Sequence, residues 1–508
     1  MTATASLPNH VDVLIVGAGL SGIGAAYHVM RGCPDRSTAI IEGRARMGGT
    51  WDLFRYPGIR SDSDMPTLGY TFRPWTGERS IADGPSILRY IEETATEFGI
   101  DRHIHYRTRL THADWRTEDA RWHVTLDTPE GERRITCGFL FAGTGYYDYA
   151  AGHRPHFEGE ERFGGRIVHP QHWPDDLDWT SKRVVVIGSG ATAVTLVPEM
   201  ARDAAHVTML QRSPTWIAAM PSRDALADRL RRWFGDRAGH RLTRWKNIGL
   251  GMAFFQAAQR MPGAIGRLML KGAAKALPEG FDVARHLTPS YKPWDQRLCL
   301  VPDGDLFAAV KEERATIVTD QIEHFDERGI VLASGERIDA DIVVAATGLR
   351  VQILGGATAS VDGEPVAMGR TYSYKGAMYS GVPNFAVALG YTNASWTLKS
   401  ELIARYVVRL LNHMEAKGYS YAVPLTPGPE MGDRTIFELS SGYLERARDI
   451  IPRQTERGPW RQHQNYLRDV ALLRLGGVAD QMAFGRAGDP DAIKRSAPRT
   501  EPRVREAA

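Results

Sequence analysis

Three glycines near the start of the chain have the spacing of a phosphate-binding turn. Gly17, Gly19 and Gly22 follow Val11-Asp-Val-Leu-Ile-Val16, a run of β-branched and aliphatic residues typical of a buried parallel strand. In this GxGxxG arrangement the first glycine permits a tight turn, the second lets backbone approach a pyrophosphate, and the third lets a helix pack closely on the strand. The N-terminus of that helix then binds the phosphates.

A carboxylate at the end of the next expected strand completes this first nucleotide site. Ser37-Thr-Ala-Ile-Ile41 is predicted to be that strand, and Glu42 follows it directly. An acid at this distance from the glycines accepts hydrogen bonds from ribose hydroxyls. Glycines alone would fit any glycine-rich loop, but strand, turn, helix and terminal acid together predict an adenosine diphosphate site.

The same pattern returns further along the chain. Lys182-Arg-Val-Val-Val-Ile187 reads as a second buried strand, and Gly188, Gly190 and Ala193 follow it in a GxGxxA arrangement. The chain therefore contains a second predicted dinucleotide site.

The second site ends differently from the first. Its next strand, His206-Val-Thr-Met-Leu210, leads to Arg212 and Ser213 where the first site has an acid. An acid would repel a 2′-phosphate, whereas Arg212 can bind it bidentately and Ser213 can donate a hydrogen bond. NADPH is therefore expected in preference to NADH. The alternative is that Arg212 is an ordinary solvated surface arginine.

Two dinucleotide sites in one chain predict that a hydride passes from a nicotinamide to a flavin. We expect FAD at the first site and NADPH at the second. The predicted fold class is α/β, with two Rossmann-like dinucleotide-binding domains and an inserted helical subdomain.

Composition limits the other possibilities. The chain has 508 residues, of which 43% are hydrophobic, and its net charge of +3 is too small to suggest a nucleic-acid partner. Cys33, Cys137 and Cys299 form no CxxC pair, so we expect no metal site and no redox disulfide. The N-terminus lacks the basic start of a signal peptide, and no stretch approaches the roughly 20 apolar residues of a membrane span. A cytoplasmic protein is expected.

Two longer motifs resemble the signatures of one flavoenzyme family. The segment Phe163 to Asp175, FGGRIVHPQHWPD, matches the FxGxxxHxxxWP[DV] fingerprint of type I Baeyer–Villiger monooxygenases. The segment Gly48 to Asp62, GGTWDLFRYPGIRSD, matches a second signature of that family, [AG]GxWxxxxYPGxxxD. The resemblance covers about Asp12 to Leu398, and across much of that length the sequence is most similar to the ethionamide-activating branch of the family.

The resemblance implies roles for particular residues. In the family, reduced flavin and O2 give a peroxyflavin that must stay anionic to attack a ketone, and a nearby arginine supplies the positive charge. Arg297 matches that arginine and Asp62 the acid that orients it. The alternative is a structural ion pair between two domains. Trp51, like Asp62, is expected at the FAD site. His169 is expected to contact NADPH, with a purely structural linker histidine as the alternative.

The resemblance also implies an activity. The expected enzyme is an FAD- and NADPH-dependent Baeyer–Villiger monooxygenase that uses O2 to convert ketones to esters or lactones and also oxidises sulfides or thioamides. One alternative is a flavin-containing monooxygenase limited to S- or N-oxygenation, and another is a non-catalytic flavin-binding sensor or scaffold. Gln296 stands where many members have a lysine that contributes to 2′-phosphate binding, so the preference for NADPH over NADH is open.

The expected organisation places the NADPH domain inside the FAD domain. The segments are 1–150 (FAD domain, first part), 151–220 (linker and NADPH domain, first part), 221–285 (helical insertion), 286–345 (NADPH domain, second part), 346–485 (FAD domain, second part) and 486–508 (a tail predicted to be disordered because it is rich in proline and charge).

The helical insertion has an unusual composition. Arg223 to Lys275 contains twelve basic residues against three acidic ones, interleaved with Trp233, Phe234, Trp245, Phe254 and Phe255. Such a helix can lie on an anionic membrane. The preferred interpretation is a lid over the substrate cleft with a solvated basic face, and peripheral membrane contact is the alternative.

Overall fold

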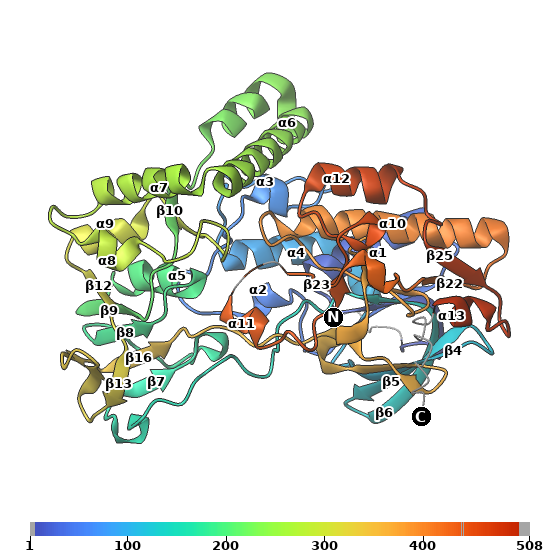
Figure 1. Cartoon of the computed structure of the whole chain (residues 1–508), viewed down its shortest axis with the longest axis horizontal. Helices are drawn as coiled ribbons and strands as arrows, with labels where there is room; N and C mark the ends of the chain where they lie inside the picture. The colour runs from blue at the N-terminus through green and yellow to red at the C-terminus, as the bar shows by residue number, and fades with distance from the viewer. Residues whose placement is uncertain (1–5, 438, 440, 497–508) are drawn as a thin grey trace, which may run out of the picture.

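A computed structural model describes residues 6–437, 439 and 441–496, and it shows two lobes side by side (Figure 1). The first lobe is built on a mixed sheet with the order β18-β17-β4-β5-β6-β1-β2-β3, and β21 pairs with β6. Its strands are β1 (His10–Val16), β2 (Thr38–Glu42), β3 (Ile104–Tyr106), β4 (Arg109–Arg116), β5 (Arg121–Thr128), β6 (Gly131–Ala142), β17 (Thr358–Val361), β18 (Glu364–Pro365) and β21 (Phe385–Val387).

The parallel part of this sheet is formed by apolar strands that are buried on both faces. In β1 the last four residues are all buried, as expected for a strand with helices on either side. Helix α1 (Leu20–Gly32) follows β1 and packs against α10 (Trp396–Lys417). A Cβ at Gly22 would lie 1.8 Å from the carbonyl oxygen of Gly17, so only glycine permits this approach of helix to strand.

The second lobe contains a fully parallel sheet. Its order is β12-β9-β8-β16-β7, the pattern of a doubly wound dinucleotide-binding fold. The strands are β7 (Arg166–Val168), β8 (Arg183–Ile187), β9 (His206–Gln211), β12 (Ala315–Thr319) and β16 (Ile342–Ala345), and the helices α5 (Ala191–Met200) and α9 (Asp305–Lys311) pack against them. The predicted α/β class with two Rossmann-like domains is confirmed.

Three helices form the insertion between β10 (Ile217–Met220) and β11 (Cys299–Pro302). They are α6 (Ala225–Arg260), α7 (Pro262–Ala276) and α8 (Val283–Leu287). Gly235 breaks α6 with φ of 74°, so the chain turns back on itself and forms a hairpin that projects from the body (Figure 1). Within the described residues we find no helix whose length and hydropathy would suit a membrane span.

The C-terminal segment differs from its prediction. The disordered tail was expected from residue 486, but α13 (Asp491–Ser496) follows β25 (Met482–Gly485) and packs on it. Ala492 is fully buried, and the carbonyl of Ser496 accepts a hydrogen bond from the hydroxyl of Thr426. Contacts with β25 and with residues about 70 positions earlier in the chain therefore hold this charged segment in place. The rest of the predicted tail, 497–508, lies outside the described residues.

Candidate active site

The first glycine turn opens onto a cavity of about 530 Å³ in the first lobe. Residues predicted from three separate stretches of sequence line this one cavity: Gly17, Gly19, Glu42, Trp51, Asp62 and Arg297. Gly22 lies beneath the turn, where it permits the close packing of α1. A cavity lined by glycine backbone, a carboxylate and aromatic rings suits an adenine dinucleotide with an attached ring system.

Glu42 is held rigidly at the edge of this cavity. It is the last residue of β2 and is 7% exposed. Its two carboxylate oxygens accept hydrogen bonds from the backbone N–H groups of Ala18 and Arg44, each at 2.9 Å. The carboxylate therefore ties the glycine turn to the end of β2, and its remaining lone pairs are available to a ribose.

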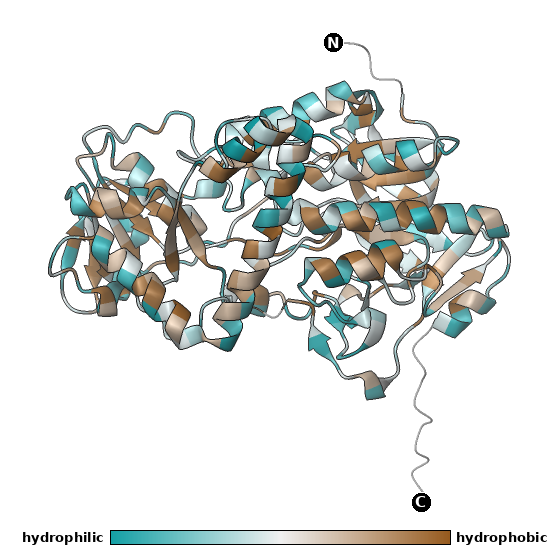
Figure 2. Ribbon diagram, turned by 90° about the horizontal axis from the view of Figure 1, so that it is seen from above, coloured by the Kyte–Doolittle hydropathy of each residue, from teal (hydrophilic) through white to brown (hydrophobic). Residues whose placement is uncertain are grey.

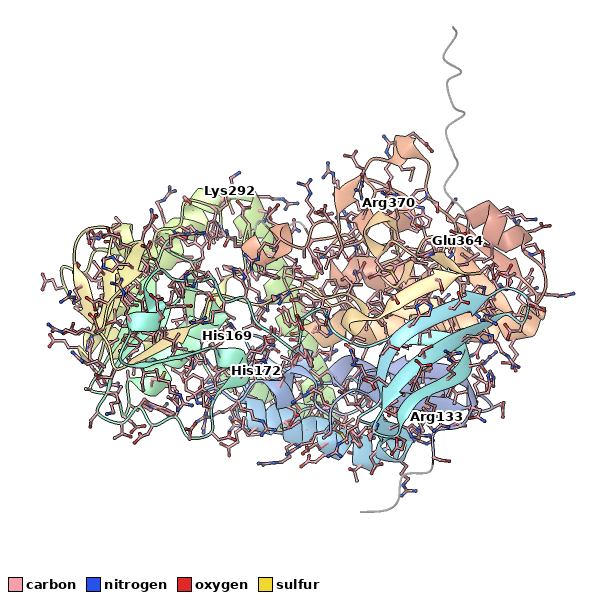
Figure 3. All side chains as sticks on the ribbon, turned by 90° about the horizontal axis from the view of Figure 1, so that it is seen from below. Arg133, His169, His172, Lys292, Glu364 and Arg370 are labelled. Atoms are coloured by element: carbon pink, nitrogen blue, oxygen red, sulfur yellow. The ribbon has the colours of Figure 1, made fainter. Side chains whose placement is uncertain are left out.

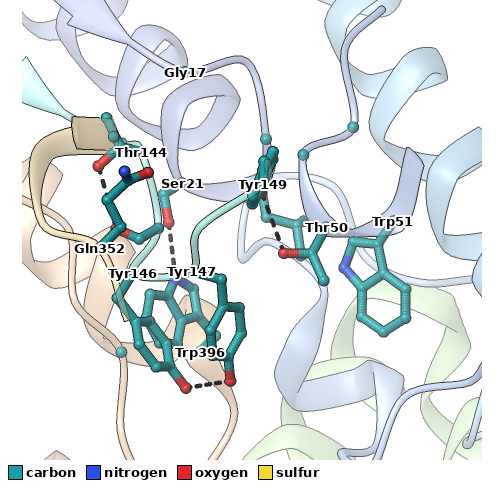
Figure 4. Close-up of a pocket in the computed structure, with 18 of the residues that line it drawn as sticks. Gly17, Ser21, Thr50, Trp51, Thr144, Tyr146, Tyr147, Tyr149, Gln352 and Trp396 are labelled. Atoms are coloured by element: carbon teal, nitrogen blue, oxygen red, sulfur yellow. Dashed lines mark hydrogen bonds between the residues drawn. The ribbon is translucent and has the colours of Figure 1, made fainter. Parts of the chain in front are cut away.

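An aromatic wall in this cavity was missed by the sequence analysis (Figure 4). The rings of Tyr146 and Trp396 stack with centroids 5.3 Å apart, and the hydroxyls of Tyr146 and Tyr147 are 2.6 Å apart. The indole N–H of Trp396 donates to the hydroxyl of Ser21 at 2.8 Å. The two tyrosines follow the Gly143-Thr-Gly145 turn at the end of β6, and that position was the available signal.

Arg297 and Asp62 form an ion pair at the inner end of the cavity. The Nε of Arg297 donates to Oδ2 of Asp62 at 2.7 Å, and Nη1 donates to the carbonyl oxygen of Thr392 at 3.1 Å. Burial acts to lower the pKa of Arg297, but the charge of Asp62 and its hydrogen bond outweigh it and raise the pKa above its ordinary value. The guanidinium is therefore a permanent positive charge with a fixed orientation.

A larger cavity of about 950 Å³ meets the first one at this ion pair. Asp62, Arg297 and Tyr391 line both cavities. The walls of the larger cavity are mostly apolar, and the C-terminal half of α6 contributes Phe254 and Phe255 to them. These two rings pack edge-on against Trp294, three residues before Arg297. This chamber can hold an apolar molecule beside a fixed cation.

The second glycine turn lies next to the residues predicted to select the cofactor. Gly188 has φ of 137°, and a Cβ there would lie 2.5 Å from the carbonyl oxygen of Ala346. The hydroxyl of Ser189 donates to the carbonyl of Ser213 at 3.1 Å, which holds the turn against the end of β9. Arg212 is exposed there and, within the described residues, its side chain has no hydrogen bond or ion pair.

Gly190 and Ala193 are the other predicted residues of this turn. Gly190 is the N-cap of α5, and a Cβ there would meet nothing within 4 Å, so the space above the helix N-terminus is open. Ala193 is fully buried against the sheet. The predicted residues of the second site therefore lie around one helix N-terminus, which favours an anionic phosphate.

His169 occupies a different kind of position. It follows β7 in the linker between the lobes, near His172 (Figure 3), and lines neither of the two cavities. Its Nδ1 accepts a hydrogen bond from the N–H of Gln171 at 3.2 Å, and a Cβ on Gly152 would lie 2.0 Å from its ring. Burial lowers its pKa, so the ring is neutral at pH 7. His169 therefore lies where the chain after β7 packs against the linker at Gly152.

Two Rossmann-like lobes, each with a glycine turn, and a cation where two cavities meet define a flavoprotein of the two-dinucleotide class. The family models for Flavin-binding monooxygenase-like proteins and for an NAD(P)-binding Rossmann-like domain match residues 81–226 and 15–75. The FAD-containing monooxygenase EthA of Mycobacterium tuberculosis (strain ATCC 25618 / H37Rv) is 51% identical over 489 residues, which cover 96% of this chain and 100% of EthA. The chain belongs to the family of FAD-containing monooxygenases, and it is an enzyme.

Other relatives agree with this assignment. The putative FAD-containing monooxygenase MymA of the same strain is 50% identical and covers 95% of this chain and 99% of its own. The probable FAD-binding monooxygenase AlmA of Acinetobacter baylyi is 46% identical over 92% of this chain and 94% of its own. The resemblance predicted from the two motifs is therefore confirmed.

Solved structures show that the fold is shared more widely. A steroid monooxygenase bound to NADP aligns with a TM-score of 0.74 and 24% identity over 94% of this chain and 100% of its own. Cyclohexanone monooxygenase aligns with a TM-score of 0.67 and 21% identity over 82% of this chain and 90% of its own. These similarities support the two-lobed fold.

Proposed function

We propose that this enzyme is a Baeyer–Villiger monooxygenase that uses FAD, NADPH and O2 to convert apolar ketones to esters or lactones and also oxidises sulfides. The observation that carries the proposal is the Arg297–Asp62 pair where the two cavities meet. When bound, FAD supplies the activation of O2. Arg297 supplies the fixed positive charge that stabilises negative charge developing beside the substrate chamber.

The other site residues divide between the two cofactors in this proposal. The first cavity binds FAD through Gly17, Gly19, Gly22, Glu42, Trp51 and Asp62, and the second turn binds NADPH through Gly188, Gly190, Ala193, Arg212, Ser213 and His169. The domain division follows: 1–150 with 346–485 for FAD, and 151–220 with 286–345 for NADPH, interrupted by the insertion 221–285. The positions of β17 and β21 in the first sheet support the return of the chain to the FAD domain.

The apolar chamber supports the substrate class. Phe254, Phe255 and Leu298 contribute apolar surface to it, and the chamber has room for molecules larger than a short-chain ketone. The three cysteines are free and buried, which supports the reducing cytoplasm as the compartment.

The test is product analysis with purified holoenzyme, NADPH and matched ketones and sulfides. Wild-type enzyme should form esters from ketones, and Arg297→Ala should lower that rate about a hundredfold or more, equivalent to about 2.7 kcal/mol of lost transition-state stabilisation. Reduction of the flavin by NADPH needs no such charge and should survive, so the variant should release hydrogen peroxide. Arg297→Lys, which keeps the charge but loses the planar fork, should fall between the two.

Two results would count against this function. A normal ester yield in Arg297→Ala would remove the proposed role of the cation. Oxygenation of sulfides without any ester from ketones in the wild-type enzyme would assign the protein to S-oxygenation instead.

A further inference from the structure

Large apolar side chains are exposed on the face formed by α6, α7 and α12 (Tyr466–Val470). Trp233 is 70% exposed and Phe234 is 56% exposed, and they are adjacent in the chain. The others on this face are Leu226, Leu242, Trp245, Leu250, Met261, Leu268 and Leu467. Soluble monomers rarely leave so many large apolar side chains together in water, so this surface is expected to have a partner.

The same helices carry many positive charges and few negative ones. Between residues 225 and 276 the acidic residues are Asp228 and Asp236. Within the described part of the chain, the following exposed side chains on α6 and α7 have neither a hydrogen bond nor an ion pair: Arg229, Arg232, Arg237, Arg241, Arg260, Arg267, Lys271 and Lys275. An excess of cations among exposed aromatic residues is typical of helices that lie on anionic lipid.

The shape of α6 presents these residues outward. The break at Gly235 reverses the chain, and Gly239 packs so tightly against the backbone of Arg231 that a Cβ there would approach within 2.6 Å. Trp233 and Phe234 therefore lie at the tip of a closed helical hairpin that stands out from the body (Figure 1). Seen from above, hydrophobic and hydrophilic segments alternate along these helices (Figure 2).

The substrate chamber opens on this same surface. Leu250 on α6 and Leu268 on α7 both line the chamber of about 950 Å³, yet they are 62% and 65% exposed. Met220, which precedes the insertion, also lines the chamber and is 40% exposed. Three exposed apolar side chains therefore line the chamber, and two of them, Leu250 and Leu268, belong to the exposed face.

We propose that this face docks on an anionic lipid bilayer. Trp233 and Phe234 enter the interface between headgroups and acyl chains, and the unpaired arginines and lysines contact lipid phosphates. A second copy of the chain is a poorer partner, because a two-fold contact would bring the same unpaired cations against each other. Docking would place the chamber mouth at the membrane, so that lipophilic substrates enter without crossing water; this last step rests on the proposed function.

The primary test is flotation of the holoenzyme with vesicles of phosphatidylcholine alone or with added phosphatidylglycerol. Binding is expected with the anionic vesicles and should weaken strongly in high salt. Trp233→Ser with Phe234→Ser, and separately Arg229→Glu with Arg232→Glu, should each raise the apparent Kd at least tenfold. The control for the apolar change is Ile450→Ser, which alters an exposed apolar side chain elsewhere. The control for the charge change is Arg121→Glu with Arg370→Glu, at two exposed arginines outside this face. Arg370 is labelled in the view from below (Figure 3). Both controls should bind like the wild type.

Several outcomes would overturn the proposal. The first is that the wild-type enzyme does not bind the anionic vesicles. The second is that the control variants lose as much vesicle binding as the test variants. The third is that Trp233→Ser with Phe234→Ser converts a dimer to a monomer in sedimentation while vesicle binding stays the same. None of these measurements requires turnover, so they stand apart from the ketone assay. If the docking is correct and the ketone chemistry holds, vesicles should raise kcat/KM for long-chain ketones and leave short-chain ketones unaffected.

Discussion

At the scale of single residues, the charged side chains of the site differ in whether other groups of the protein already bind them. Glu42 is bound by two backbone N–H groups and Arg297 is held by Asp62, so neither can reorient when a cofactor binds. Arg212 is exposed at the end of β9 and, within the described residues, has no partner to give up. Such an arginine can bind a phosphate without first losing an ion pair.

The consequence can be measured with Arg212→Ala. Loss of a charge-assisted contact should raise the KM for NADPH about tenfold or more and leave the KM for NADH nearly unchanged, because NADH has no 2′-phosphate. Arg212→Lys should give an intermediate KM, since lysine keeps the charge without the bidentate fork. Equal increases for the two cofactors in steady-state kinetics would show that Arg212 does not read the 2′-phosphate.

At the scale of elements, one buried carboxylate joins three parts of the chain. Glu401 on α10 accepts hydrogen bonds from His28 on α1 at 3.1 Å and from the hydroxyl of Thr71 at 2.7 Å. It also pairs with Arg244 of α6 at 3.5 Å, and Arg244 donates to the carbonyl oxygens of Pro66 and Gly69. Helix α6 is therefore anchored to the first lobe through this cluster.

Stability should follow the titration of Glu401. Burial alone would raise the pKa of this carboxyl, but the hydrogen bond from His28 and the charge of Arg244 outweigh it and lower the pKa from 4.5 to about 2. Since the folded-state pKa is depressed, the stabilisation is complete above about pH 5 and is lost as the pH falls towards 2. The shift corresponds to about 3 kcal/mol.

Glu401→Gln should therefore lower the Tm at pH 7, and the difference from wild type should shrink between pH 5 and pH 3. Glu415→Gln is the matched control, because Glu415 lies on the same helix with an exposed side chain paired to Arg36. Thermal denaturation across this pH range decides the point. A difference in Tm that stays constant down to pH 3 would contradict the assignment.

At the scale of the whole molecule, one segment of the first lobe holds the second lobe in place. Arg60 pairs with Asp305 at the start of α9, and Asp62 pairs with Arg297. The N–H of Ser80 donates to the carbonyl of Ser222, just before the helical insertion. These contacts between the lobes thus lie beside the contact that orients the site cation.

Weakening these contacts between the lobes should uncouple NADPH oxidation from substrate oxygenation without removing the flavin. Arg60→Ala and Asp305→Ala should each increase the hydrogen peroxide released per NADPH oxidised by a few fold, and the double variant should be little worse than either one, because the two residues form one interaction. Arg328→Ala removes an ion pair with Asp339 that lies within the second lobe, and serves as the control. Additive effects, or an equal effect in the control, would place the role of Arg60 elsewhere.

Sequence patterns were enough to predict the two glycine turns, their strands, the positions of Glu42 and Arg212 at strand ends, and the basic helical insertion. Each of these follows from local patterns, because turn geometry, strand burial and helix formation depend on residues a few positions apart. The aromatic wall of Tyr146, Tyr147 and Trp396, and the chamber with its exposed mouth, became visible in the folded chain alone. Arg297 and Asp62 are 235 residues apart and were paired only through a family motif. Contacts of this kind come from the packing of two lobes, and no local periodicity encodes them.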